Sequence, residues 1–243
     1  MDVALRSTLV PIAFLDSVVL KHYLCHLPLS MMCVHRHIAL GHDAMYDPLS
    51  TFWAGARAAC GDVLLFLHAD CLLPQDWDLH VRNALGQQST IAGAFSFDVH
   101  SDSGAADGLP LPVRMLRAST NFRSTTFQLP YGDQALFVSR SRFQSLGGFA
   151  DLPLMEDYEF VTRLRRAALH TTLCGGREMR VCILSQAARC SIRRWRTKGV
   201  LSNTISNQLI VILYVFAWMS PKRLFAMYYG IRPQDARASS KAK

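Results

Sequence analysis

The sequence predicts an α/β fold with a mostly parallel, doubly wound sheet, on three observations. Half of the 243 residues are hydrophobic, so a sizeable core can be buried. From Thr51 onward, apolar runs of strand length alternate with segments of helical period. The apolar runs are continuous rather than alternating, which is typical of parallel strands that helices cover on both faces.

Each element follows from composition and period. Val63–Leu67 is wholly apolar and follows a Gly-Asp break, which predicts a buried strand. Helical spacing over Asp157–Ala168 places four apolar side chains on one inward face, namely Phe160, Val161, Leu164 and Ala168. The predicted elements are helix Ala54–Ala59, strand Val63–Leu67, helix Pro74–Leu85, strand Ile91–Val99, a loop from His100 to Pro112, strand Ala135–Ser139, a turn at Gly147-Gly148, helix Asp157–Ala168 and strand Val181–Leu184.

The chain divides into three regions. Residues 1–50 follow neither period and form an atypical or diverged N-terminal segment; residues 51–230 form the regular domain, and residues 231–243 a basic disordered tail. Near the end of the domain, Leu209–Met219 is apolar over eleven residues, whereas a membrane-spanning helix needs about 20. We expect a C-terminal apolar helix that is buried or interfacial, because Lys222 and Arg223 follow it at once.

Positive charge is concentrated in the C-terminal quarter. The net charge is +8, and the segment from Arg177 to Lys243 contains thirteen basic and two acidic residues. Such a segment suits phosphates of nucleic acid, of anionic lipid or of a phosphorylated substrate. Nucleic acid ranks lowest as a partner, because no recognition motif accompanies the arginines.

The seven cysteines are an odd number without a C-x-x-C pair, and most lie in apolar stretches. This usage predicts reduced thiols in the core and therefore a cytoplasmic protein. Association of this protein with a membrane surface is a second expectation.

His68-Ala69-Asp70 directly follows the first predicted strand, at the carboxyl end where open α/β sheets bind ligands. A carboxylate there suits a divalent cation, Mg²⁺ or Mn²⁺, with phosphate oxygens as further ligands. The alternative is that Asp70 caps the helix beginning near Pro74.

Glu156 and Asp157 stand at the start of a predicted helix, where the helix dipole favours negative charge. One of these carboxylates can cap the helix while the other does chemistry. The alternative is a solvated capping pair.

Two further motifs carry polar groups that turns do not require. Asp133 and Gln134 lie between a Pro-Tyr-Gly turn and an apolar strand. Arg193, Arg194 and Trp195 combine guanidinium groups with an indole, which suits phosphate binding and sugar stacking. The alternative for the second motif is a basic solvated loop with Trp195 in the core.

Together these motifs resemble the inverting glycosyltransferase family 2, which has the GT-A fold, and most of all its radical-SAM/selenodomain-associated or arsenosugar-biosynthesis branch. The resemblance runs from about Thr51 to Tyr229 and rests on G-D-V-L-L-F-L-H-A-D, L-P-Y-G-D-Q-A-L-F-V and G-G-F-A-D-L-P-L-M-E-D-Y-E-F.

The resemblance implies a metal-assisted transfer of a sugar from a nucleotide-diphosphate sugar to the hydroxyl of a small-molecule or lipid-linked acceptor. It places Asp70 as the metal ligand and Asp157 as the general base, with Glu156 in support. The residues expected to bind donor and acceptor are His68, Asp133, Gln134, Arg193, Arg194 and Trp195.

The sequence departs from the family in its N-terminal part. The motifs of the first two β-α units, which hold the donor nucleotide, are missing from Met1 to Ser50, and Ser191 stands where the Q-x-x-R-W motif has Gln. The segment is then a diverged one that still forms strands, the product of a wrong gene start or a frameshifted gene, or part of a non-catalytic relative that binds a sugar, a phosphate or a partner. A third hypothesis is a transferase that contacts the membrane peripherally through residues 207–229.

Overall fold

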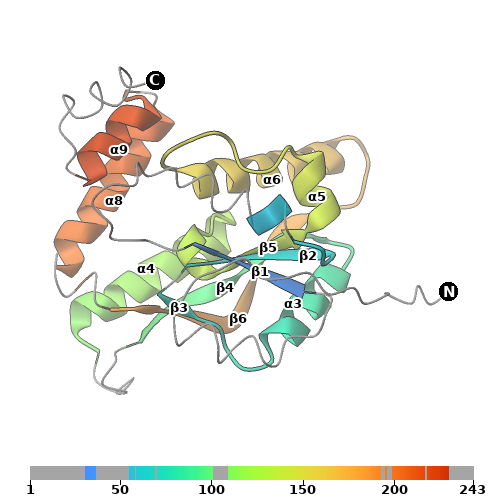
Figure 1. Ribbon diagram of the computed structural model, residues 1–243, viewed down its shortest axis with the longest axis horizontal. Coiled ribbons are helices and arrows are strands. Elements are labelled where there is room, and N and C mark those ends of the chain that lie inside the picture. The colour runs from blue at the N-terminus through green and yellow to red at the C-terminus, as the bar shows by residue number, and fades with distance from the viewer. Residues whose placement is uncertain are drawn as a thin grey trace.

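The computed structural model describes residues 31–36, 55–57, 59–68, 70–100, 109–192, 195, 199–216 and 218–229. In this part of the chain, helices pack around a six-stranded sheet (Figure 1). The disordered tail predicted for residues 231–243 lies outside the described residues, and so does most of the atypical N-terminal segment.

The sheet is mixed. Its strands are β1 (Met31–Arg36), β2 (Val63–His68), β3 (Cys71–Leu72), β4 (Thr90–His100), β5 (Leu136–Ser139) and β6 (Arg180–Ser191), in the order β1-β2-β5-β4-β6-β3. The pairs β1/β2 and β4/β6 are parallel, whereas β5 runs antiparallel to both neighbours and β3 antiparallel to β6. The α/β class is therefore confirmed, and the prediction of a mostly parallel sheet is wrong.

The antiparallel direction of β5 has a structural cause. The chain reaches β5 through the short helix η1 (Gly132–Gln134), which contacts β2. Because Leu136 at the start of β5 pairs with Phe66 near the end of β2, the two strands run in opposite directions. This connection also places η1 beside His68, the last residue of β2.

The first strand lies in the segment whose sequence shows no clear period. β1 pairs in parallel with the whole of β2, from Met31 opposite Val63 to Arg36 opposite His68. Residues 31–36 of the atypical segment therefore form a strand beside β2.

Both faces of the sheet are covered, which explains the continuous apolar runs. On β2, Leu65 and Leu67 pack with residues of α3 (Trp77–Gly86) and α4 (Leu111–Phe127). Leu64 and Phe66 point to the other face and pack with residues of α5 (Arg140–Ser145) and α6 (Glu156–Leu173). The four inward positions predicted for α6 are all buried.

Two helices follow the sheet, α8 (Val200–Val215) and α9 (Pro221–Tyr229). The predicted apolar run Leu209–Met219 covers the second half of α8 and the turn after it. Across the described residues, no helix has both the length and the apolar character that a membrane crossing requires.

The prediction that all cysteines are reduced is wrong for one pair. Cys71 and Cys190 form a disulfide, while Cys174 and Cys182 are outside any disulfide. The antiparallel pairing of β3 with β6 places the two residues opposite one another, with their Cα atoms 4.2 Å apart. Their separation of 119 residues hides this relation in the sequence.

Replacing Gly93 of β4 tests the packing at the centre of the sheet. A Cβ at this position would lie 2.4 Å from Cζ of Phe137 and 2.8 Å from the carbonyl oxygen of Cys182. We expect Gly93→Ala to lower the free energy of unfolding by about 1–3 kcal/mol, the usual effect of overpacking, as measured by urea denaturation. The control is Gly86→Ala, because no atom lies within 4 Å of a Cβ there. Equal free energies of unfolding for Gly93→Ala and Gly86→Ala would contradict the close packing of Gly93 against Phe137.

Candidate functional site

A pocket with a volume of about 160 Å³ lies at the carboxyl end of β2. Its walls come from η1, the loop before α6, the start of α6, and helices α8 and α9. The polar side chains lining it are His68, Asp133, Glu156, Asp157 and Asn207. A cavity of about 150 Å³ accommodates one benzene ring, so the pocket has room for a single ring such as that of a sugar.

Gly132 allows two of these side chains to approach one another. A Cβ on Gly132 would lie 2.5 Å from Nε2 of His68 and 3.1 Å from Oδ2 of Asp157. Any larger residue would therefore displace His68. The sequence explains this glycine by turn chemistry, but Gly132 is not among the glycines with positive φ, and close approach is its structural reason.

Asp157 is fixed by two backbone groups. Its Oδ2 accepts a hydrogen bond from the N–H of Gly132 at 2.7 Å, and its Oδ1 accepts one from the N–H of Tyr158 at 2.6 Å. The carboxylate stands in the first turn of α6, where the helix dipole attracts negative charge. Glu156 precedes it in the same turn and is 5 % exposed. Both predicted carboxylates therefore line one pocket, and Asp157 is the more exposed of the two.

Two non-glycine residues with left-handed backbone border this site. Met155, with φ 73°, directly precedes Glu156, and Ala135, with φ 49°, directly follows Gln134. Such conformations cost about 1–3 kcal/mol each and persist where the surroundings enforce them, often at functional sites. The turns that present Asp133 and Asp157 are thus both held in unusual conformations.

Tyrosines form much of the remaining wall, and sequence reasoning missed them. Tyr131, Tyr158, Tyr228 and Tyr229 all line the pocket. The Tyr131 and Tyr158 rings meet edge to face, with centroids 6.2 Å apart. The sequence contains a signal for these two tyrosines, because each belongs to a motif with a predicted site carboxylate. Tyr131 stands in Y-G-D-Q and Tyr158 in E-D-Y-E. No such motif marks the other pair.

Tyr131 is partly buried and lies beside Arg123. Burial raises the pKa of its phenol above 10.0, against the opposing effect of the Arg123 guanidinium. That guanidinium lies 3.4 Å from the centre of the Tyr131 ring, in a cation–π contact. Near neutral pH the phenol therefore keeps its proton.

Asp70 lies near the pocket without lining it. Its carbonyl oxygen accepts a hydrogen bond from the N–H of Ser191 at 2.8 Å, which anchors the end of β6. The next residue, Cys71, has its Sγ 3.8 Å from the carbonyl oxygen of Asp133, and the partner sulfur of Cys190 is 3.1 Å from that oxygen. The disulfide thus lies between Asp70 and the Asp133 segment of the pocket wall. Within the described ranges, no group of three or more His, Cys, Asp or Glu side chains is arranged to hold a metal ion.

Gln134 is part of the scaffold rather than of the pocket lining. It is fully buried, and its Nε2 donates hydrogen bonds to the carbonyl oxygen of Phe95 at 3.0 Å and to Oγ of Ser124 at 3.1 Å. Its Oε1 lies 3.4 Å from both the N–H of Tyr131 and a guanidinium nitrogen of Arg123. The side-chain amide of Gln134, which the sequence predicted to bind a ligand, instead fixes η1 onto β4 and α4.

The last predicted motif is described only in part. Trp195 is 9 % exposed and packs edge to face on Phe97, with ring centroids 5.8 Å apart. It therefore occupies the core, as in the alternative derived from the sequence, and does not line the pocket. Arg193 and Arg194 lie outside the described residues.

Comparison of the chain with protein-family models gives no match, and comparison with curated proteins gives none either. The chemistry of the site is therefore inferred from its own residues and from the motifs that carry the resemblance.

Proposed function

We propose that this protein is an inverting glycosyltransferase that moves a sugar from a nucleotide-diphosphate sugar to an acceptor hydroxyl. One observation supports this most directly. The Asp157 carboxylate lines a ring-sized pocket at the carboxyl end of β2, with His68 and Asp133 in the same wall. Each of these three residues belongs to one of the three motifs on which the resemblance to glycosyltransferase family 2 rests.

In this proposal Asp157 is the general base. The hydroxyl oxygen of the acceptor attacks the anomeric carbon as the bond from that carbon to the diphosphate oxygen breaks, and the configuration inverts. Asp157 takes the hydroxyl proton as the new bond forms. The hydrogen bond from Gly132 to Oδ2 orients the carboxylate, and Glu156 supports it as its neighbour in the first turn of α6.

The other pocket residues bind and orient the sugar. Tyrosine rings offer apolar faces for packing against a sugar ring, and their hydroxyl groups offer hydrogen bonds. The imidazole of His68 and the carboxylate of Asp133 provide polar contacts at the end of the pocket nearest β2. Ile210 and Val211 of α8 contribute apolar side chains to the pocket lining.

A single carboxylate is enough for a divalent metal that shares its coordination with substrate. Mg²⁺ is usually bound by one or two carboxylates together with substrate phosphates and water. Asp70 would hold Mg²⁺ or Mn²⁺, and the next residue, Cys71, has its Sγ 3.8 Å from the backbone carbonyl oxygen of Asp133. The chemistry that a bound metal supplies is neutralisation of the negative charge on the departing diphosphate.

Replacing Asp157 by Asn tests its role as the base. We expect Asp157→Asn to lower turnover by about a hundredfold or more, the usual effect of losing a general base, with little change in stability. The measurement is release of nucleoside diphosphate from a panel of UDP- and GDP-hexoses with mixed sugar acceptors and Mn²⁺. Asp151→Asn is the matched control, because Asp151 is an exposed carboxylate of the loop before α6. Unchanged turnover in Asp157→Asn would remove that residue from the base role.

Calorimetric titration with UDP and GDP, each with and without Mn²⁺, tests donor binding. We expect one nucleotide to bind more tightly with Mn²⁺, and Asp70→Ala to abolish the effect of the metal while leaving the metal-free affinity unchanged. Absence of binding under every condition would favour the non-catalytic alternative, a relative that binds a sugar, a phosphate or a partner.

A further inference from the structure

Helix α8 carries apolar side chains on two opposite faces. Its inner face packs Ile210, which is 4 % exposed, while Asn207 and Val211 line the pocket. Its outer face exposes Ile205, Leu209, Ile212 and Phe216, spaced by four, three and four residues. This spacing forms a single stripe along the helix, so the exposed apolar residues are gathered rather than scattered.

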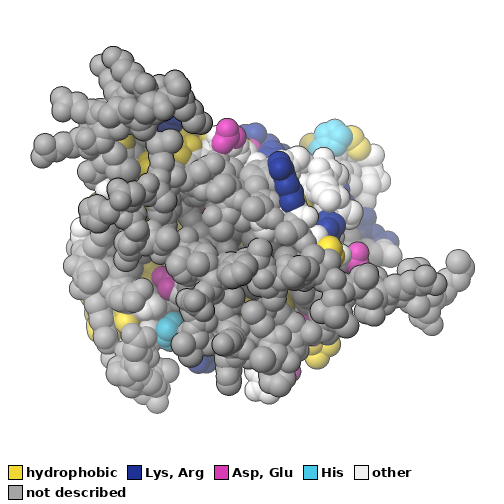
Figure 2. Space-filling view, in the orientation of Figure 1, with side chains coloured by type: hydrophobic (Ala, Val, Ile, Leu, Met, Phe, Trp, Pro, Cys, Tyr) yellow, Lys and Arg dark blue, Asp and Glu magenta, His cyan; other side chains and the backbone are white. Residues whose placement is uncertain are grey.

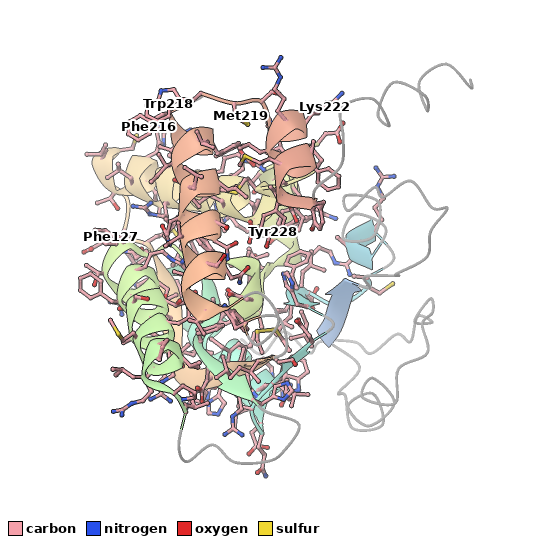
Figure 3. The ribbon with its side chains drawn as sticks, turned by 90° about the vertical axis from the view of Figure 1, so that its left-hand side faces the viewer. Phe127, Phe216, Trp218, Met219, Lys222 and Tyr228 are labelled. Atoms are coloured by element: carbon pink, nitrogen blue, oxygen red, sulfur yellow. A yellow bond between two sulfur atoms is a disulfide. The ribbon has the colours of Figure 1, made fainter. Side chains whose placement is uncertain are left out.

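The stripe ends in an exposed aromatic corner between α8 and α9. The rings of Phe216 and Trp218 are stacked, with centroids 5.3 Å apart, and these side chains are 62 % and 69 % exposed. Figure 3 shows both rings at the outer end of α8, on the same side of the molecule as Phe127 of α4. Helix α4, which contacts α8, exposes two further large apolar side chains, Phe122 and Phe127.

Positive charge follows the aromatic corner in the sequence, and Figure 3 shows Lys222 at the same end of the molecule, on the α9 side. Lys222 and Arg223 are exposed in the first turn of α9, directly after the aromatic corner. The sequence contains no Asp or Glu from Met179 to Gln234. In the space-filling view, some hydrophobic side chains are visible at the surface near α9 (Figure 2).

We infer that the outer stripe of α8 and the α8–α9 corner dock on an anionic membrane surface. Trp and Phe side chains favour the boundary between lipid headgroups and acyl chains, and an apolar helix face inserts there with the helix lying in the plane of the interface. Lys222 and Arg223 then meet lipid phosphates, whose negative charge attracts them to the surface. A second copy of the chain is disfavoured as the occupant, because the same face would bring like charges together.

The docking has a consequence for the pocket. The same helix that contacts lipid with its outer face lines the pocket with its inner face, and Tyr228 and Tyr229 of α9 complete that wall. An acceptor with a lipid tail, held in the interface, would therefore reach the pocket across a single helix. This consequence rests on the proposed glycosyl transfer, whereas the docking itself does not.

Co-sedimentation of the full chain with vesicles tests the docking. We expect binding to vesicles of equal parts phosphatidylcholine and phosphatidylserine, weak binding to phosphatidylcholine alone, and a decrease with added salt. The double variant Phe216→Ser, Trp218→Ser should lower the partition coefficient by about tenfold or more, because two aromatic side chains no longer enter the interface. The double variant Lys222→Glu, Arg223→Glu should remove the preference for phosphatidylserine.

The control is Leu173→Ser, since Leu173 is 76 % exposed at the end of α6 farthest from the pocket. This variant should sediment as the wild type does, and urea denaturation should show equal stability for all variants. Wild-type sedimentation of the aromatic double variant would overturn the proposal. So would a dimer in sedimentation velocity that this variant abolishes without any vesicle binding, because the surface would then join two copies of the chain.

Discussion

The site depends on a close approach of three chain segments at Gly132. The end of β2 contributes His68, the start of α6 contributes Asp157, and η1 passes between them with a residue that has no side chain. The N–H of Gly132 binds Oδ2 of Asp157, so the same residue that makes room also orients the carboxylate. The antiparallel direction of β5 is what brings η1 to this edge of the sheet, because β5 begins where β2 ends. A change in either the strand direction or the glycine would separate the two functional side chains.

Much of the fold could be predicted because it follows from hydrophobic patterning. Runs buried on both faces, such as Val63–His68, and an inward stripe, such as that of α6, depend on the local sequence alone. The placement of Asp157, Glu156, His68 and Asp133 in one pocket follows from a second rule. Residues that end strands or begin helices lie at the same edge of an α/β sheet.

Other features could not be predicted, because they depend on tertiary packing. Hydrophobicity carries no strand direction, so the antiparallel β5 and the Cys71–Cys190 pair were missed. No element was predicted over α4 because its buried positions include Thr120 and Ser124, while its large apolar residues point outward. Gln134 and Trp195 are residue types that suit ligand binding as well as they suit the core. Their burial becomes visible only when their neighbours in the fold are placed.

The surface and the pocket share helix α8, which links the two proposals without making either depend on the other. Apolar residues on both faces of one helix are unusual for a protein surrounded by water alone, because only the inner face is covered by the protein itself. The inner face of α8 lines the pocket, and its outer face carries the exposed apolar stripe on which the membrane-docking proposal rests.

The most direct test of the central claim is the effect of Gly132→Ala on nucleoside diphosphate release and on the free energy of unfolding. The added Cβ meets the far end of the His68 side chain, which can rotate away, so the unfolding free energy should change by no more than about 1 kcal/mol. Turnover should fall by about a hundredfold, since a displacement near 1 Å at a reacting centre has that effect. Full turnover in Gly132→Ala would show that the approach of His68 and Asp157 is not what the reaction requires.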